Sequence, residues 1–304
     1  MSRRILVTGG AGFVGSTIAD ALAADGDDVV VVDDLATGDR ANVSPGIELV
    51  IADIADHDQL FAALGGRRFD AVVHCASKTK VVESMAKPEL YRRVIVQGTA
   101  EILGLAVATG SRAFVNFSSG GVAYGETPVC ATEDSPVAPI SPYGVHKIAA
   151  EGLVAASPVP AVTLRPANIY GPRQRTDLEG GVIAIFAGRW RTGQPLVVRG
   201  PGTAERDYVY VGDVAAAVRT ALGATLDREI TGVFNIGTGV AISVNGIVAA
   251  LTEVLGPPPG ILHEPLPAVE LERSCVDPDK AWRDLGWRAS TSLAEGLRLT
   301  CGVS

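Results

Sequence analysis

Near the start of the chain stands the sequence Arg4-Ile-Leu-Val-Thr-Gly-Gly-Ala-Gly-Phe-Val-Gly15. Ile5 to Val7 form a short apolar run with β-branched residues, which is typical of a buried parallel strand. Gly9, Gly12 and Gly15 follow at once, with the spacing that dinucleotide-binding loops place between a strand and a helix. The sequence therefore predicts a parallel α/β unit that opens with a phosphate-binding turn.

These glycines have distinct expected roles. The missing side chain at Gly12 lets the backbone approach a pyrophosphate. At Gly15 it lets the next helix pack close to the sheet, with its first N–H groups facing the phosphates. A glycine-rich turn without a ligand is the alternative, because the chain holds 35 glycines and chance matches are expected. The strand before the loop, the helix after it and an acid further on favour dinucleotide binding.

That acid is Asp33, which ends the apolar run Val29–Asp33, 18 residues after Gly15. A carboxylate at this place can hold a ribose 2′-hydroxyl. It favours NAD over NADP, because a 2′-phosphate would face its negative charge. Arg40 could soften that repulsion.

Composition bounds the class of protein. The chain has 304 residues, of which 47% are hydrophobic and 20% charged, as in soluble globular proteins. No apolar run reaches the 18 residues of a membrane helix, and the chain enters a strand too early for a signal peptide. The net charge of −8 disfavours a nucleic-acid partner.

Four cysteines are widely scattered, without a C-x-x-C pair: Cys75, Cys130, Cys275 and Cys301. This spacing favours reduced thiols over disulfides or zinc, so no metal site and a cytoplasmic location are predicted.

The first half of the chain alternates apolar runs with helical patterns, which predicts a doubly wound parallel sheet. After the two runs above, further strands are expected at Ile47–Ile51, Ala71–Ala76, Ala113–Ser118 and Ala161–Arg165. A long helical pattern covers Pro88–Ala108. Asp53 follows the third strand, at the edge where such sheets bind ligands; a loop aspartate that caps the next helix is an equal alternative.

Beyond Pro166 the βα rhythm is lost. Helices are expected near Val182–Thr192, Asp213–Ala224, Ser243–Leu255, Asp277–Leu285 and Ser292–Leu299, strands near Leu196–Arg199 and Val233–Gly237, and a hairpin at Gly200–Gly202. We therefore predict a nucleotide-binding domain over residues 1–171 and a smaller, mixed α/β lobe over 172–304. Residues from about 206 to 240 would return to the large domain.

Ser141-Pro-Tyr-Gly-Val-His-Lys147 carries a second chemical signal. Residues i and i+4 of a helix share a face, so Tyr143 and Lys147 can point together toward a cofactor. A nearby ammonium lowers the pKa of a phenol and so makes it a general base or acid. An exposed pair on a helix surface is the alternative.

With these motifs in hand, the chain resembles the extended short-chain dehydrogenases/reductases, and among them the nucleotide-sugar epimerases of the UDP-glucose 4-epimerase type. The resemblance runs nearly from end to end. Besides the glycine loop, Asp33 and the Tyr143–Lys147 pair, it rests on Val82-Glu-Ser84, Ser118-Ser-Gly-Gly-Val-Ala-Tyr-Gly125, Asn168-Ile-Tyr-Gly-Pro-Arg-Gln174, Arg206-Asp-Tyr-Val-Tyr-Val211, Asn235-Ile-Gly-Thr-Gly239 and Leu285-Gly-Trp287.

The resemblance implies a reversible hydride transfer. Tyr143 would take the proton of the sugar 4-hydroxyl while the C4 hydride passes to NAD, and the 4-keto sugar would turn and take the hydride back on its other face. Lys147 would hold the nicotinamide ribose and lower the pKa of Tyr143. A serine hydroxyl would bind the reacting oxygen.

The resemblance also implies two sets of binding residues. NAD would contact Gly9, Gly12, Phe13, Val14, Gly15, Asp33, Asp34, Asp53, Ile54, Ala76, Tyr143 and Lys147. A UDP- or dTDP-hexose would contact Ser118, Ser119, Tyr143, Asn168, Val182, Val198, Arg199, Arg206 and Asp277. Three of these residues have an alternative interpretation. Arg206 could form a surface ion pair with Asp207, Asn168 could cap the loop, and Arg199 could have no role in binding.

Three departures from the family pattern concern the substrate side. The usual place of the catalytic hydroxyl holds Gly120, so we expect Ser119 to supply it, with Ser118 in support. The family's Arg-Pro-Gly-Asp is here Pro267-Ala-Val-Glu270, so a diphosphate contact is lost or passes to Arg173 or Arg273. The lysine of UDP-galactose epimerases falls on Thr79, between two lysines.

Rival functions follow from the same residues. A nucleotide-sugar 4,6-dehydratase needs an acid and a base beside the catalytic hydroxyl, where this chain has Gly120-Gly121. Reductases and decarboxylases also belong to the group, and Asp33 disfavours an NADP reductase. A regulator that binds NAD without turnover would not need the Tyr143–Lys147 pair.

A homodimer is expected through a four-helix bundle, as in family members. The helical stretches 88–108 and 143–156 carry apolar residues on more than one face, including Ile102, Leu103, Leu105, Ala149, Leu153 and Val154. Cover by the chain's own loops is the alternative.

Overall fold

The computed structural model describes residues 2–176, 181–266 and 271–303. Its main feature is a seven-stranded sheet in the order β10-β6-β5-β4-β1-β2-β3, in which every pair is parallel. The strands are β1 (Arg4–Thr8), β2 (Asp28–Asp33), β3 (Glu48–Ile51), β4 (Ala71–His74), β5 (Ala113–Phe117), β6 (Ala161–Pro166) and β10 (Gly232–Ile236). The predicted doubly wound parallel sheet is confirmed.

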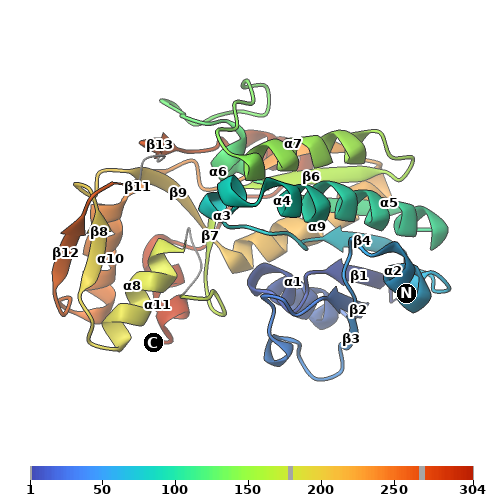
Figure 1. Cartoon of the computed structure of the whole chain (residues 1–304), viewed down its shortest axis with the longest axis horizontal. Helices are drawn as coiled ribbons and strands as arrows, with labels where there is room; N and C mark the ends of the chain where they lie inside the picture. Colours follow the sequence, from blue (N-terminus) through green and yellow to red (C-terminus); the bar gives the residue numbers. More distant parts are fainter. Residues whose placement is uncertain (1, 177–180, 267–270, 304) are drawn as a thin grey trace.

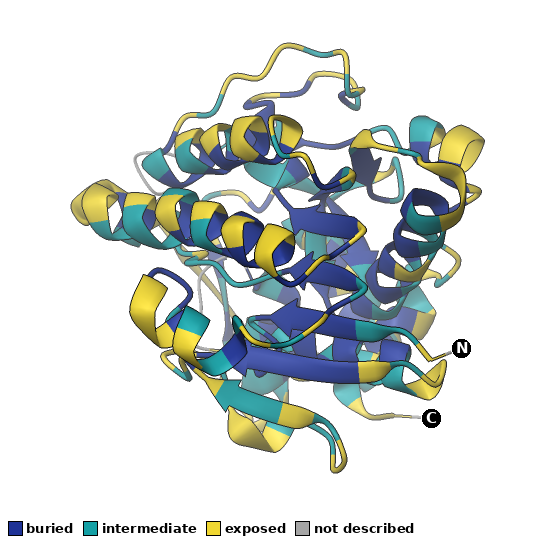
Figure 2. Cartoon of the chain, turned by 90° about the vertical axis from the view of Figure 1, so that its right-hand side faces the viewer, coloured by how far each residue is buried: buried dark blue, intermediate teal, exposed yellow. Residues whose placement is uncertain are grey.

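Helices cover both faces of this sheet (Figure 1). One face packs against α1 (Phe13–Ala24) and α9 (Val211–Arg228), and the other against α2 (His57–Leu64), α5 (Gly98–Ala108) and α7 (Pro142–Ala155). The side chains of β1 alternate between the two cores: Ile5 and Val7 join the first, and Leu6 joins the second. In Figure 2 the central strands are buried, whereas the edge strand β3 is intermediate to exposed, and the covering helices are exposed on their outer sides.

The helical pattern over 88–108 is one continuous run made of three parts. α4 (Pro88–Arg92) leads through a π-helical turn (Arg93–Gln97) into α5. The short helices α3 (Val81–Ala86) and α6 (Gly120–Ala123) follow the carboxyl ends of β4 and β5, and a 3-10 turn lies at Arg40–Asn42.

Smaller sheets lie to the left in Figure 1. β9 (Glu205–Tyr210) pairs with β7 (Asn168–Tyr170), β11 (Ala241–Ser243) and β13 (Arg273–Ser274). β8 (Leu196–Arg199) pairs in parallel with β12 (Ile261–Glu264). The predicted hairpin at Gly200–Gly202 is therefore wrong, because β8 and β9 join different sheets.

Helices α8 (Val182–Arg191), α10 (Val244–Leu255) and α11 (Leu293–Cys301) pack around these small sheets. The helix expected over Asp277–Leu285 is shorter than predicted: it begins at Asp279 and continues as a π turn over Ala281–Leu285. Among the helices of the described residues, none combines the length and the apolar character needed to cross a membrane.

Candidate active site

The glycine loop, residues 9–15, lies where the chain order of the strands reverses between β1 and β4, the place where such sheets bind ligands. Gly9 has a φ of +67°, and a Cβ there would come within 2.8 Å of the Ala76 backbone, beyond β4. A Cβ at Gly15 would overlap the Gly9 carbonyl oxygen, so α1 packs on the loop only without a side chain at this position. The Cys75–Ala76 segment thus forms the second wall of the loop.

Helix α1 begins just inside this loop. Its N-cap is Gly12, and no side chain caps its first turn, which includes Phe13 and Val14. The N–H groups of a first turn have no partner within the helix and carry the positive end of the helix dipole. The uncapped turn and the side-chain-free cradle therefore fit a pyrophosphate.

Asp33 ends β2 beside this loop and is 7% exposed. Its carboxylate accepts hydrogen bonds from the backbone N–H of Ala11 (3.0 Å) and of Leu35 (2.8 Å). Burial raises the pKa of Asp33, and these two bonds oppose that rise. A carboxylate has about four lone-pair sites, so two remain for a ribose hydroxyl.

The other residues predicted to touch the cofactor differ in their surroundings. Asp34 is exposed and accepts from Ala36 N–H at 2.9 Å. Asp53 accepts from Ala55 N–H and pairs with Arg93 at 2.6 Å. Asp56, not Asp53, caps α2 through Gln59 N–H, so the capping alternative for Asp53 is wrong. Ile54 is 5% exposed.

The carboxyl end of β5 carries the two candidate hydroxyls. Ser118 is 5% exposed, and its Oγ has no hydrogen-bond partner among the described residues. Ser119 is the N-cap of α6 and hydrogen-bonds the side chain of Tyr143. A Cβ at Gly121 would lie 3.2 Å from Asn168 Oδ1 and 3.9 Å from Ser119 Oγ, so these two polar groups share one side of α6.

Tyr143 and Lys147 project from the first two turns of α7 and are 8% and 7% exposed. The exposed-pair alternative is therefore wrong. The Lys147 ammonium donates to the Phe117 carbonyl oxygen at 2.8 Å, at the end of β5. It also acts electrostatically on His74 and Cys75, at the end of β4. β1, β4 and β5 are neighbours, so these groups and the glycine loop share one edge of the sheet.

The residues predicted to hold the nucleotide lie on the smaller sheets. Asn168 begins β7 and is not a loop cap. Arg206, within β9, donates to the carbonyls of Glu205 and Leu271, both at 2.8 Å. Asp207 is 1% exposed and binds Thr238 and Gly239, so a surface ion pair with Arg206 is wrong.

The remaining substrate candidates are spread along the lobe. Val198 (1% exposed) and the exposed Arg199 end β8, and Val182 begins α8. Asp277 follows β13 and accepts from Asp279 N–H at 2.9 Å. Within residues 2–176, 181–266 and 271–303, no hydrogen bond or ion pair joins these four to Ser119 or Tyr143.

Of the expected substitutes for the family arginine, Arg173 pairs with Asp20 at 2.7 Å and Arg273 with Glu205 at 3.1 Å. Pro267–Glu270, which replaces the family motif, lies outside the described residues.

Comparison with known proteins agrees with this geometry. The model of the NAD dependent epimerase/dehydratase family matches residues 5–237. The UDP-glucose 4-epimerase of Mycolicibacterium smegmatis is 38% identical over 307 residues, which cover 98% of this chain and 97% of that protein. The chain belongs to the NAD dependent epimerase/dehydratase family.

Two solved structures of this family are close in fold. The Thermus thermophilus UDP-glucose 4-epimerase, in complex with NAD, has a TM-score of 0.92 at 37% identity, and 98% of each chain is covered. The Thermotoga maritima UDP-glucose 4-epimerase, with UDP-glucose, has a TM-score of 0.91 at 35% identity and covers 98% of this chain and 97% of its own. The predicted family and its NAD cofactor are confirmed.

The structure corrects the electrostatic prediction for Tyr143. Burial raises the pKa of its phenol to about 12, and the hydrogen bond with Ser119 opposes that rise. Burial lowers the pKa of Lys147 to about 8. In this structure burial therefore determines the direction of the shift, and the expected net lowering of the phenol pKa is not found. The Lys147 ammonium lies against the Phe117 carbonyl oxygen.

The cysteine prediction is wrong for two of the four residues. Cys130 and Cys275 form a disulfide, whereas Cys75 and Cys301 are free. The pair is 145 residues apart in sequence, and a parallel bridge between two irregular segments, at Ala131 and Val276, brings it together. Spacing along the chain carries no signal for such a pairing, because the contact depends on the tertiary fold.

Sequence reasoning also missed two buried polar groups close to the Lys147 ammonium. His74 bonds Thr8 Oγ1 at 2.7 Å and Thr99 Oγ1 at 3.1 Å, and Thr8 in turn accepts from Ala76 N–H. Glu151, one turn after Lys147, forms a buried ion pair with Arg165 at 2.7 Å. The signal that could have found these groups is a polar residue within an otherwise apolar strand, as Thr8, His74 and Arg165 are.

Proposed function

We propose that this protein is an NAD-dependent 4-epimerase of a nucleotide-activated hexose, of the UDP-glucose/UDP-galactose type. The single observation that carries the proposal is that Tyr143 and Lys147 are both buried, one turn apart on α7, at the sheet edge that holds Ser119 and the glycine loop. The similarity to UDP-glucose 4-epimerases over nearly the full chain supports a UDP-sugar as the substrate class.

Residues of the glycine loop, Asp33 and Lys147 would hold the cofactor. When bound, NAD supplies a hydride acceptor and a positively charged ring. Tyr143 would hold and move the proton of the sugar 4-hydroxyl, and Ser119 would donate to the reacting oxygen. A phenol is protonated at neutral pH and burial raises the pKa of Tyr143 further, so a positive charge beside it is needed to make it a base.

Lys147 is suited to a second role. An ammonium has three N–H donors, and the Phe117 carbonyl takes one of them. The other two donors are available to ribose hydroxyls. Its neighbour Glu151 lies one turn further along α7 and raises the pKa of Lys147, against the effect of burial.

Dehydration has less support than epimerisation. A 4,6-dehydratase needs acid and base side chains directly after the catalytic serine. Here a Cβ at Gly120 would come within 2.7 Å of Val276 Cγ1 and within 2.9 Å of the Arg165 carbonyl oxygen. The packing therefore excludes an acidic side chain at this position.

The test uses the purified protein without added cofactor. We expect bound NAD in the denatured extract and conversion of UDP-glucose to its C4 epimer by NMR, within a panel of UDP- and dTDP-hexoses. Tyr143→Phe should lose at least about 10³-fold in kcat and keep its NAD. A product lighter by one water would instead identify a dehydratase, and bound NAD without any turnover would identify a regulator.

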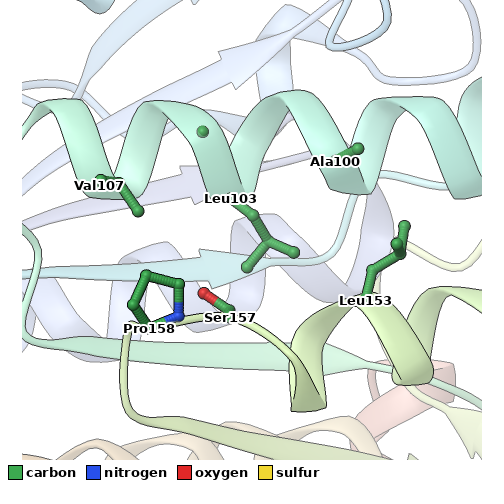
Figure 3. A pocket seen from close by; sticks show the side chains of 7 residues that line it. Ala100, Leu103, Val107, Leu153, Ser157 and Pro158 are labelled. Carbon is green, nitrogen blue, oxygen red and sulfur yellow. The ribbon is translucent and has the colours of Figure 1, made fainter.

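We further propose a homodimer through α5 and α7. A hollow of about 250 Å³ lies between these helices, lined by Ala100, Leu103, Gly104, Val107, Leu153, Ser157 and Pro158 (Figure 3). Val107 is 51% and Leu153 36% exposed, whereas Ile102, Leu105 and Val154 point into the chain's own core. Two copies would bury this face as a bundle of four helices.

The oligomeric state tests the dimer. Light scattering should give twice the chain mass, and Leu153→Glu should shift it to the monomer without loss of bound NAD. A monomeric wild-type protein at micromolar concentration would overturn the proposal.

A cytoplasmic location is also proposed, with the nucleotide-sugar substrate class as its support. The disulfide opposes it, since disulfides are rare in cytosolic proteins. Fractionation of the source cells decides between the two.

A further inference from the structure

Helix α7, which carries Tyr143, begins with an unusual set of hydrogen bonds. Its N-cap is Ser141, and Pro142 at the first helical position has no N–H to satisfy. The Ser141 hydroxyl accepts from Gly144 N–H at 3.2 Å. The N–H of Tyr143 donates instead to the Oγ of Ser84, also at 3.2 Å, which belongs to the separate helix α3.

The geometry at Ser84 fixes the direction of this bond. Ser84 is fully buried, and its hydroxyl donates to the Val81 carbonyl oxygen at 2.6 Å. A hydroxyl has one proton and two lone pairs, so the proton is committed to Val81 and a lone pair faces Tyr143 N–H. Without Ser84, that N–H would be a buried donor without a partner.

Helix α3 is itself held firmly. The hydroxyl of Tyr91, on α4, accepts from Lys80 N–H and bonds Glu83 Oε2, both at 3.1 Å. The Tyr91 ring meets the Tyr143 ring edge-on at 6.4 Å between centroids, and it is fully buried. Tyr143 is thus held at its N–H by Ser84, at its ring by Tyr91 and at its hydroxyl by Ser119.

This arrangement also connects Tyr143 to the cofactor side. α3 follows β4 through the segment 75–80, whose Ala76 forms the second wall of the glycine loop. The bond from Ser84 therefore ties the backbone of Tyr143 to the segment that borders the expected cofactor.

We infer that Ser84 is a positioning residue for Tyr143, which rests on the role proposed above for that tyrosine. Its hydroxyl sets the start of α7 and so the distance from the phenol to the reacting oxygen. A displacement of about 1 Å at a catalytic group can cost about 10²-fold in rate. We therefore expect Ser84→Ala to lower kcat by about 10- to 100-fold, with KM changed less than about threefold and NAD content unchanged.

Ser141→Ala is the matched control. It removes a bond of the same kind and length from the same turn of α7, but to Gly144, which has no side chain to misplace. Each variant should lower the midpoint of denaturant unfolding by a similar amount, because each removes one side-chain hydrogen bond from the first turn of α7. Measured per folded molecule, kcat should fall much more in Ser84→Ala than in Ser141→Ala.

The pH profile separates positioning from simple destabilisation. The Ser119 hydrogen bond lowers the Tyr143 pKa, so a displaced phenol loses part of that effect. The apparent pKa for the activity of Ser84→Ala should therefore rise, and Ser84→Thr, which keeps the hydroxyl, should restore both kcat and the profile. Equal kcat and equal profiles in Ser84→Ala and Ser141→Ala would overturn the inference.

Two further variants keep the test decisive. If Ser84→Ala does not fold, Tyr91→Phe releases α3 while it retains the ring against Tyr143, and it should lower kcat by about 3- to 10-fold. An unchanged kcat in Tyr91→Phe would then refute the inference. Tyr143→Phe is assayed in parallel: full activity there would refute the proposed function itself, whereas an inactive Tyr143→Phe beside a fully active Ser84→Ala refutes only the role of Ser84.

Discussion

The glycine loop and the segment pair that carries the disulfide are built in opposite ways. The loop is made from seven consecutive residues, 9–15, and closes on itself through bonds such as Gly12 N–H to the Gly9 carbonyl oxygen (3.1 Å). The pair, which we call the strap, joins residues 126–131 to residues 273–277. Its contacts, such as Ala131 N–H to the Cys275 carbonyl oxygen (2.9 Å), span more than a hundred residues.

Both regions border the candidate active site. The loop forms its cofactor side, whereas the strap packs on α6: a Cβ at Gly120 would meet Val276, and Ser274 Oγ donates to the Gly121 carbonyl oxygen at 3.3 Å. The difference teaches that the glycine loop is encoded by local sequence, whereas the packing on α6, which follows Ser119, depends on tertiary pairing. Substitutions in the loop should therefore affect NAD binding most, and substitutions in the strap should affect stability most.

The largest effect is expected at the loop. Gly15→Ala places a Cβ against the Gly9 carbonyl oxygen, so α1 must move away from the pyrophosphate position. We expect the purified protein to lose most of its bound NAD, because the first N–H groups of α1 would no longer face the pyrophosphate. Gly223→Ala, within α9, serves as the control, because a Cβ there has open space around it. Gly26→Ala is unsuitable, because Gly26 also has open space but a positive φ, which Gly15 does not have. Full NAD occupancy in Gly15→Ala would contradict the local account of the loop.

Substitutions in the strap should lower the stability of the protein and leave its NAD binding unchanged. Breaking the Cys130–Cys275 bond with a thiol reductant, or by Cys130→Ser with Cys275→Ser, should lower the free energy of unfolding by about 2–4 kcal/mol. NAD content should not change, because no strap residue belongs to the loop. Cys301→Ser, at a free cysteine, should have no such effect.

Unfolding curves with and without reductant provide the measurement. Identical midpoints would show that the strap is held by its hydrogen bonds alone, which would remove the disulfide from this comparison.

A smaller effect is expected from His74, which supports the loop through Thr8. Burial, together with the Lys147 ammonium, lowers the pKa of His74 to about 3. The unfolded chain therefore binds a proton near pH 6.5, whereas the folded chain does not, so stability is full above pH 6.5 and falls as the pH drops toward 3. Between pH 7 and 5 we expect a loss on the order of 2 kcal/mol.

His74→Gln keeps a donor and an acceptor for the two threonines but has no proton to take up. The free energy of unfolding of His74→Gln should therefore fall less between pH 7 and 5 than that of the wild-type protein, by about 2 kcal/mol. Parallel slopes for the two proteins between pH 7 and 5 would contradict the assignment of a buried neutral imidazole.

The same contrast explains what could be predicted from sequence. The loop, Asp33 and the six strands of the first half follow from local apolar runs and glycine spacing, and the structure has them at those places. The parallel pairing of β8 with β12, in place of the expected hairpin, depends on residues more than 60 positions apart. The disulfide joins residues 145 positions apart.

The candidate site shows the same division. Its Tyr143–Lys147 spacing is visible within one helix, and so are the serines after β5. The groups packed around the pair are not visible in this way: Ser84 and Tyr91, which contact Tyr143, and the Phe117 carbonyl, which contacts Lys147, come from three other elements. Burial of a side chain is a property of the packed chain, so the sign of the Tyr143 pKa shift could not be obtained from i, i+4 spacing.

The central claim is that Tyr143 moves the proton of the 4-hydroxyl while the hydrogen on C4 moves as a hydride. A UDP-hexose labelled with deuterium at C4, epimerised by the protein in ordinary water and analysed by mass spectrometry and NMR, tests it most directly. We predict that the deuterium remains at C4 of the epimer. Replacement of the label by solvent hydrogen would contradict the account, because C4 would then have lost a proton.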